Sequence, residues 1–168
     1  MRKLVLVSGI VVVLTGCAGM QASQTRKEFV QKKLEGVPFS MVDKHVAKRR
    51  FEDVVSSLRQ KTAECFNVDV TTRRTQGGMT TSQVKDEYRT TIRLVGANRA
   101  ELTTQYTSKG IIYLQKIPEG GFYSRAVDID RLTPGTTKLT YYGSSFESGK
   151  RDWAAIKDWG DGKATPCP

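Results

Sequence analysis

Two stretches of the chain place apolar residues at helical spacing, one on each side of a long alternating region. In residues 51–65 the apolar side chains recur every three or four positions, and the polar ones occupy the opposite face. Trp153, Ile156 and Trp159 form the second stripe, which Gly160 ends. This spacing predicts two amphipathic helices that each pack against other elements. Two tryptophans on one short helix indicate a large buried contact.

Between these helices the hydrophobic period falls to two residues, which is the period of a β-strand with one buried face. Turns that contain glycine separate the segments, and the predicted strands are 66–71, 84–94, 100–107, 111–117, 122–131 and 136–143. Residues 39–49 fit either a strand or a helix face, and the strand is the favoured interpretation. Short strands with short connections favour an antiparallel meander.

The order of elements is strand, helix, about six antiparallel strands and helix, which is an α+β arrangement. We expect a curved antiparallel sheet of about six or seven strands, with an N-terminal and a C-terminal helix packed on one face. In element order this fold resembles the helix-grip group, which includes START-like lipid-binding domains and a lipoprotein subunit of the outer-membrane assembly machinery. The resemblance is one of topology, since no motif of either protein is matched.

The first seventeen residues follow the order of a secretory signal, with basic Arg2 and Lys3, an apolar run over 4–14 and then small residues. That run is too short for a membrane-spanning helix, which needs about 20 apolar residues. Its end, Leu14-Thr15-Gly16-Cys17, resembles the bacterial lipobox. The resemblance implies a diacylglycerol on the Cys17 thiol and cleavage immediately before Cys17. The alternative is a cleaved, unanchored protein in which Cys17 is incidental.

These motifs divide the chain into a signal peptide over 1–16, a lipidated N-terminus with a flexible tether over 17–36, and one α+β domain over 37–168. The charged stretch 26–34 fits either a tether or a weak helical turn. No aspartate follows Cys17. For a Gram-negative host, the sorting rule of enterobacterial lipoproteins then implies an outer-membrane anchor, with the domain facing the periplasm.

The remaining cysteines, Cys65 and Cys167, are an even pair once Cys17 is assigned to the lipid. In an oxidising compartment an even pair favours one intramolecular disulfide. Two unpaired buried thiols, or bridges to other molecules, are the alternatives.

Basic residues outnumber acidic ones by ten, and by eight once Arg2 and Lys3 leave with the signal. This excess suits an anionic neighbour: phospholipid headgroups, lipopolysaccharide phosphates, teichoic acid or an acidic protein. Export argues against nucleic acid as the partner. The candidate basic surface comprises arginines on or beside the predicted strands: Arg73, Arg74, Arg89 and Arg93. Scattered solvation of the surface is the alternative.

Few residues indicate catalysis. The only histidine, His45, has no unpaired cysteine to join it, so neither a Ser-His-Asp hydrolase nor a structural zinc site is expected. Asp128 and Asp130 lie two positions apart on one strand face, as an acid–base couple or a metal clamp requires. Solvation of a strand end is the favoured interpretation. We therefore expect no enzyme, no metal site and no cofactor.

Aromatic side chains have the strongest binding character, and the candidates are Tyr88, Tyr106, Tyr141 and Trp153, joined by Tyr113 and Tyr123 if the register holds. On a curved sheet covered by a helix they can line a cleft, although ordinary cross-strand core pairs are favoured. The expected function is a membrane-anchored, non-catalytic binding or assembly module. The alternative is a carrier that holds a lipid or other apolar ligand between the sheet and the C-terminal helix. A core filled by Trp153 and Trp159 would argue against the carrier.

Overall fold

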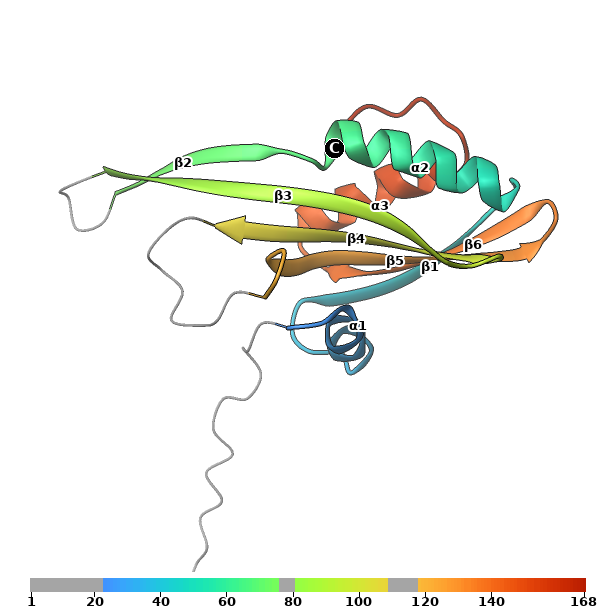
Figure 1. The fold of residues 1–168 in the computed structure, drawn as a ribbon, viewed down its shortest axis with the longest axis horizontal. Helices are drawn as coiled ribbons and strands as arrows, with labels where there is room; N and C mark the ends of the chain where they lie inside the picture. The colour runs from blue at the N-terminus through green and yellow to red at the C-terminus, as the bar shows by residue number, and fades with distance from the viewer. Residues whose placement is uncertain (1–22, 76–80, 109–117) are drawn as a thin grey trace, which may run out of the picture.

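The described part of the chain forms a six-stranded antiparallel sheet with helices on both faces (Figure 1). The structure is a computed structural model, and it describes residues 23–75, 81–108 and 118–168. In chain order the elements are α1 (Arg26–Leu34), β1 (Ser40–Ala47), α2 (Phe51–Cys65), β2 (Asp69–Thr75), β3 (Thr81–Gly96), β4 (Arg99–Ser108), β5 (Phe122–Thr133), β6 (Thr136–Ser144) and α3 (Glu147–Gly160). The predicted α+β class is therefore confirmed.

The strand order β1-β6-β5-β4-β3-β2 makes the strands from β2 to β6 a meander in which sequence neighbours pair. This confirms an antiparallel meander among the described strands, in which β4 pairs directly with β5. The ambiguous stretch before α2 is a strand, β1, which pairs with the far side of β6 from Ser40↔Ser144 to Ala47↔Thr137. β1 and β2 are therefore the two edges of the sheet. The predicted strand 111–117 lies outside the described residues.

The main core lies between one face of the sheet and the helices α2 and α3, which run side by side across it (Figure 1). Leu58 of α2 and Ile156 of α3 are fully buried and share one cluster with Leu102 and Ile129 of the sheet. Each such side chain stabilises the fold by about 1.5–3 kcal/mol relative to exposure. The apolar stripes seen in the sequence are thus the faces that α2 and α3 turn toward the sheet.

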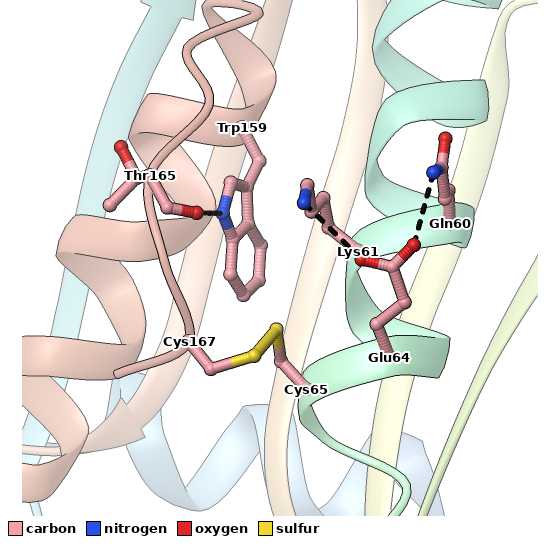
Figure 2. Close-up of a disulfide and its surroundings, with 7 residues drawn as sticks. All are labelled: Gln60, Lys61, Glu64, Cys65, Trp159, Thr165 and Cys167. Atoms are coloured by element: carbon pink, nitrogen blue, oxygen red, sulfur yellow. Dashed lines mark hydrogen bonds and ion pairs between the residues drawn. A yellow bond between two sulfur atoms is a disulfide. The ribbon is translucent and has the colours of Figure 1, made fainter.

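A disulfide joins the end of α2 to the C-terminal segment (Figure 2). Cys65 and Cys167 have their Cα atoms 5.3 Å apart, and their sulfur atoms are bonded. The same segment is held a second time, because Trp159 Nε1 donates to the Thr165 carbonyl at 2.9 Å. The cysteine pair expected from the residue count is therefore brought together by the fold.

On the opposite face of the sheet lies α1, a helix over the stretch for which the sequence left both a tether and a weak helical turn open (Figure 1). It occupies most of the second half of the range 17–36, which was expected to be a tether. A reciprocal capping box starts it: Thr25 Oγ1 accepts from the Glu28 amide, and the Glu28 carboxylate accepts from the Thr25 amide. Phe29 anchors it in a small second cluster with Ala126 and Tyr142. None of the helices in the described ranges is long and apolar enough to cross a bilayer.

Candidate functional site

A charged pocket of about 390 Å³ lies between α1 and the sheet. Its lining comes from α1, β3, β4 and β5: Arg26, Lys27, Val30, Gln31, Arg93, Arg99, Glu101 and Asp128. Four of these residues are basic and two are acidic, so the lining carries a net positive charge. We call this the α1 pocket.

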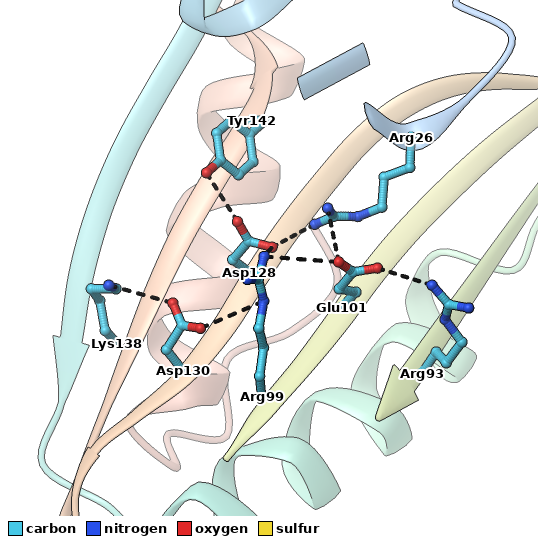
Figure 3. A network of polar contacts seen from close by, with 8 residues as sticks. All are labelled: Arg26, Arg93, Arg99, Glu101, Asp128, Asp130, Lys138 and Tyr142. Atoms are coloured by element: carbon cyan, nitrogen blue, oxygen red, sulfur yellow. Dashed lines mark hydrogen bonds and ion pairs between the residues drawn. The ribbon is translucent and has the colours of Figure 1, made fainter. Parts of the chain in front are cut away.

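Asp128 of β5 is the hub of the α1 pocket (Figure 3). One carboxylate oxygen accepts from Arg26 Nη2 at 2.7 Å and from Arg99 Nη2 at 3.1 Å. The other accepts from the Tyr142 hydroxyl at 3.0 Å. Three donors from three different elements therefore converge on one carboxylate.

The electrostatics keep this carboxylate ionised. Burial by itself would raise the pKa of Asp128, but the charge of Arg26 and the three hydrogen bonds outweigh it and hold the pKa below its usual value. Burial and the neighbouring Asp128 carboxylate raise the pKa of Tyr142 to about 12, so its hydroxyl stays a donor. A carboxylate with a lowered pKa and occupied oxygens is suited to holding cations in place, and poorly suited to acid–base catalysis.

Arg26, the first residue of α1, ties this helix to two strands (Figure 3). Besides Asp128 on β5, its guanidinium meets Glu101 of β4 at 3.2 Å. Glu101 also pairs with Arg93 of β3 at 3.3 Å. Because arginine presents a planar fork of donors, it can bridge two carboxylates in this way. The start of α1 is therefore fixed on the sheet by charge, while Phe29 fixes its middle.

The outer rim of the α1 pocket is cationic. The Arg93 side chain is 76% exposed, Arg99 is half-exposed, and Lys27 is exposed on the first turn of α1. Guanidinium and ammonium groups at the mouth of a pocket are the donors that recognise phosphate or carboxylate oxygens. Asp130 lies just outside, where Lys138 and Arg99 approach it at 3.4 and 3.7 Å.

Two of the four arginines of the predicted basic surface lie in different surroundings. Arg93 lines the α1 pocket and pairs with Glu101 at 3.3 Å, whereas Arg89 pairs with Asp69 of β2 at 2.6 Å. Arg73 and Arg74 are neighbours on β2 and pair in register with Gln83 and Ser82.

The predicted aromatic set divides into two pairs. Tyr88 and Tyr106 face each other across β3 and β4, with ring centroids 5.1 Å apart, and the Tyr106 hydroxyl donates to Asp86 at 3.0 Å. Tyr141 stacks on Trp153 at 5.2 Å, and both are almost fully buried in the main core. The second pair fills the space between the sheet and α3. Tyr113 lies outside the described residues, as does the predicted lipidation site Cys17.

His45, and Asp158 near the end of α3, also have structural partners. His45 Nε2 lies 2.8 Å from Asp161 Oδ1, just past the end of α3. Asp158 accepts from Lys163 and Thr165 at 2.7 and 3.0 Å, which ties down the C-terminal segment. Within the described ranges, no group of three or more His, Cys, Asp or Glu side chains is arranged to hold a metal ion.

Sequence reasoning missed Arg26, Lys27 and Glu101 as parts of one site. The two basic residues fell in the range assigned to the tether. The available signal was Thr25-Arg26-Lys27-Glu28, which has the spacing of a capping box and marks the start of α1.

Comparison with known proteins adds little to this description. No model of a known protein family matches the chain, and no curated protein sequence matches it. Its structure is similar to the 1.88 Å crystal structure of a hypothetical protein, jhp0584, from Helicobacter pylori. The two chains are 15% identical, and the match covers 71% of this chain and 78% of that one with a TM-score of 0.35.

Proposed function

We propose that this chain is a bacterial envelope lipoprotein, anchored through Cys17, whose folded part is a non-catalytic binding or assembly module. The lipobox-like Leu14-Thr15-Gly16-Cys17 supports the anchor. The Cys65–Cys167 pair supports export, because structural disulfides persist in oxidising compartments. For a Gram-negative host, the residue after Cys17 favours the outer membrane, with the domain facing the periplasm.

The observation that carries the binding role is the position of the α1 pocket in the chain. Cys17 and Arg26 are nine positions apart, so at about 3.6 Å per residue the chain between them spans at most about 32 Å. Arg26 lines the α1 pocket and is fixed to Asp128 and Glu101. On the proposed anchor, a cationic pocket therefore lies close to the membrane surface. Its ligand is an anionic envelope component or an acidic segment of a partner protein.

Binding is favoured over catalysis by the state of the carboxylates in the α1 pocket. Asp128 has three donors on its two oxygens and a lowered pKa, and Glu101 is shared between arginines. Asp128 is therefore not poised to exchange a proton with a substrate near neutral pH, and Glu101 is engaged by guanidinium groups. The arrangement instead orients guanidinium groups, and that is how proteins prepare sites for anions.

The module is also favoured over the carrier. A carrier needs a cleft between the sheet and α3, and there Tyr141, Trp153 and Trp159 are all buried in one packed cluster. The kinship with helix-grip domains stays a proposal drawn from element order. The proposed module needs no ligand between the sheet and α3, because its binding surface, the α1 pocket, lies on the opposite face of the sheet.

Metabolic labelling with a palmitate analogue tests the anchor. The wild-type chain should be labelled, and Cys17→Ser should not. The matched control is the double variant Cys65→Ser/Cys167→Ser, which keeps Cys17 and should still be labelled. Equal labelling of wild type and Cys17→Ser would overturn the proposed anchor.

Crosslinking in native envelopes tests the binding role. A photoreactive residue at Arg93, on the exposed rim of the α1 pocket, should capture an envelope component, and the capture should weaken as salt is raised. The same residue at Arg59, exposed on α2 on the opposite face, is the control and should capture far less. Equal, salt-insensitive capture from both positions would refute a specific role for the α1 pocket.

A further inference from the structure

An exposed pair of phenylalanines lies where α1 turns into β1 and β6 turns into α3. Phe39 precedes β1 and Phe146 is the N-cap residue of α3. Their rings stack with centroids 4.7 Å apart and planes inclined by 20°. Phe39 is 63% exposed and Phe146 is 55% exposed. Two large apolar rings therefore cover each other only in part, and the rest of their surface meets solvent.

The backbone holds this pair outward. Phe39 has φ +62°, and among the described residues it is the one non-glycine with a positive φ. A bulky residue adopts this conformation rarely, and such strain persists only where surrounding contacts enforce it. Here the Ser145 amide donates to the Phe39 carbonyl at 2.9 Å, and the Phe146 amide donates to Ser144 Oγ at 3.1 Å. These two hydrogen bonds hold the backbone on both sides of the pair, and the two rings remain exposed.

The surface next to the pair combines apolar and basic groups. Leu34, the last residue of α1, is exposed and is joined to Phe39 by a four-residue turn. Arg26 of α1 is held by Asp128 and Glu101, but α1 also carries three lysines, two of them, Lys32 and Lys33, in its last turn. Exposed aromatic rings that follow closely on lysines are typical of surfaces that rest in the headgroup region of a membrane.

We propose that the Phe39–Phe146 pair and α1 form a membrane-docking face, with the two rings inserted at the headgroup–acyl boundary of an anionic phospholipid bilayer. This inference rests on the proposed function, since it takes the domain to be tethered at Cys17. α1 is about 13 Å long at 1.5 Å per residue. The anchor enters at its first turn and the aromatic pair lies beyond its last turn. Attachment at both ends of one rigid helix fixes the orientation of the domain on the membrane.

Vesicle binding by the mature chain, residues 17–168, carrying Cys17→Ser tests the docking face without the lipid and without the apolar signal peptide. The probe is phosphatidylcholine vesicles with and without phosphatidylglycerol, assayed by cosedimentation. The Cys17→Ser chain should bind the anionic vesicles more tightly. The further changes Phe39→Ser/Phe146→Ser should weaken that binding by about tenfold or more, as expected when an aromatic side chain leaves an apolar environment. Leu132→Ser is the matched control, because Leu132 is 50% exposed at the β5–β6 turn, and it should bind as before.

Phe39→Gly separates docking from folding. Glycine accepts a positive φ without strain, so this variant should unfold at the same or a higher urea concentration and yet lose vesicle affinity. The inference is overturned if the Cys17→Ser chain does not bind anionic vesicles, or if the phenylalanine variants bind as tightly as their parent. It is also overturned if vesicle binding is absent while Phe39→Ser abolishes crosslinking to a protein, since the rings then serve a protein partner. Palmitate labelling of Cys17 is read independently, so failure of the docking face and failure of the anchor are distinguishable.

Discussion

Replacing Asp128 by asparagine should release α1 from the sheet. The Asp128 side chain is 11% exposed and accepts from two guanidinium groups and one hydroxyl. Hydrogen bonds to a charged group contribute about 1.5–3 kcal/mol each, and removing one partner of a buried ion pair costs about 3–5 kcal/mol. Arg99 is half-exposed and water can solvate it, so we expect Asp128→Asn to lower the free energy of unfolding by about 2–4 kcal/mol.

The matched control is Asp130→Asn on the same strand face. Asp130 is 27% exposed and its partners, Lys138 and Arg99, are 3.4 and 3.7 Å away. Contacts of this kind contribute about 0.2–1 kcal/mol. Urea unfolding should therefore separate the two variants clearly. Hydrogen exchange should show that Asp128→Asn exposes the α1 amides first, because α1 buries little besides Phe29.

The pH dependence gives a second measurement. The pKa of Asp128 is lowered in the folded state, so its stabilisation is complete above the unfolded pKa of about 3.9 and is lost as the pH falls through the folded value. The stability gap between wild type and Asp128→Asn should be full near neutral pH and should shrink below about pH 4. A gap of the same size at acid pH, or α1 amides as protected in Asp128→Asn as in wild type, would refute the role of Asp128 as the hub.

Three further predictions concern the rest of the fold. Removing the disulfide by Cys65→Ala should lower the free energy of unfolding by about 3–5 kcal/mol in urea, and a mobility shift on reduction, present in wild type, should vanish. Trp153→Ala should cost about 3–5 kcal/mol in thermal unfolding, because the ring stacks on Tyr141 and donates to Asp43 at 2.7 Å; an unchanged melting temperature would contradict its burial. Phe39→Gly should raise the free energy of unfolding by about 1 kcal/mol, because glycine adopts a positive φ without strain. A clear loss of stability would show that the packing of the Phe39 ring outweighs the backbone strain at this position.

The main layer of the fold was predictable because its periodicity is strong. The stripe over 51–65 became α2, the alternating segments within the described ranges became strands, and the end of the last stripe at Gly160 is the end of α3. α1 has no such stripe, since only Phe29 of its residues is buried, and its polar face resembles a tether. Its stability comes from a capping box and from ion pairs with the sheet. Neither leaves a hydrophobic period in the sequence.

The α1 pocket was not predictable for a different reason. Asp128 was named as a candidate for chemistry, but its closest partner, Arg26, is 102 positions away. The two meet only because α1 crosses the sheet on the face opposite the main core. The same limit applies to Arg89, whose charge is cancelled by Asp69 through the β2–β3 register, Asp69↔Glu87. Basic residues that lie close together in the sequence therefore do not by themselves define a basic surface. The strand register decides which acidic residues lie beside them.

If Cys17 carries the proposed anchor, the contacts of Arg26 also set how far the domain can move from the membrane. With α1 fixed on the sheet, Cys17 and Arg26 are nine positions apart, which sets an upper limit of about 32 Å on the distance between them. With α1 released, the free chain runs to the start of β1 at Ser40, which is 23 positions and about 83 Å. On the proposed anchor, the contacts of Asp128 and Glu101 with Arg26 therefore help to limit how far the domain reaches from the bilayer. An anionic ligand that draws Arg26 from these carboxylates would lengthen the tether, so binding in the α1 pocket and distance from the membrane are coupled through one side chain.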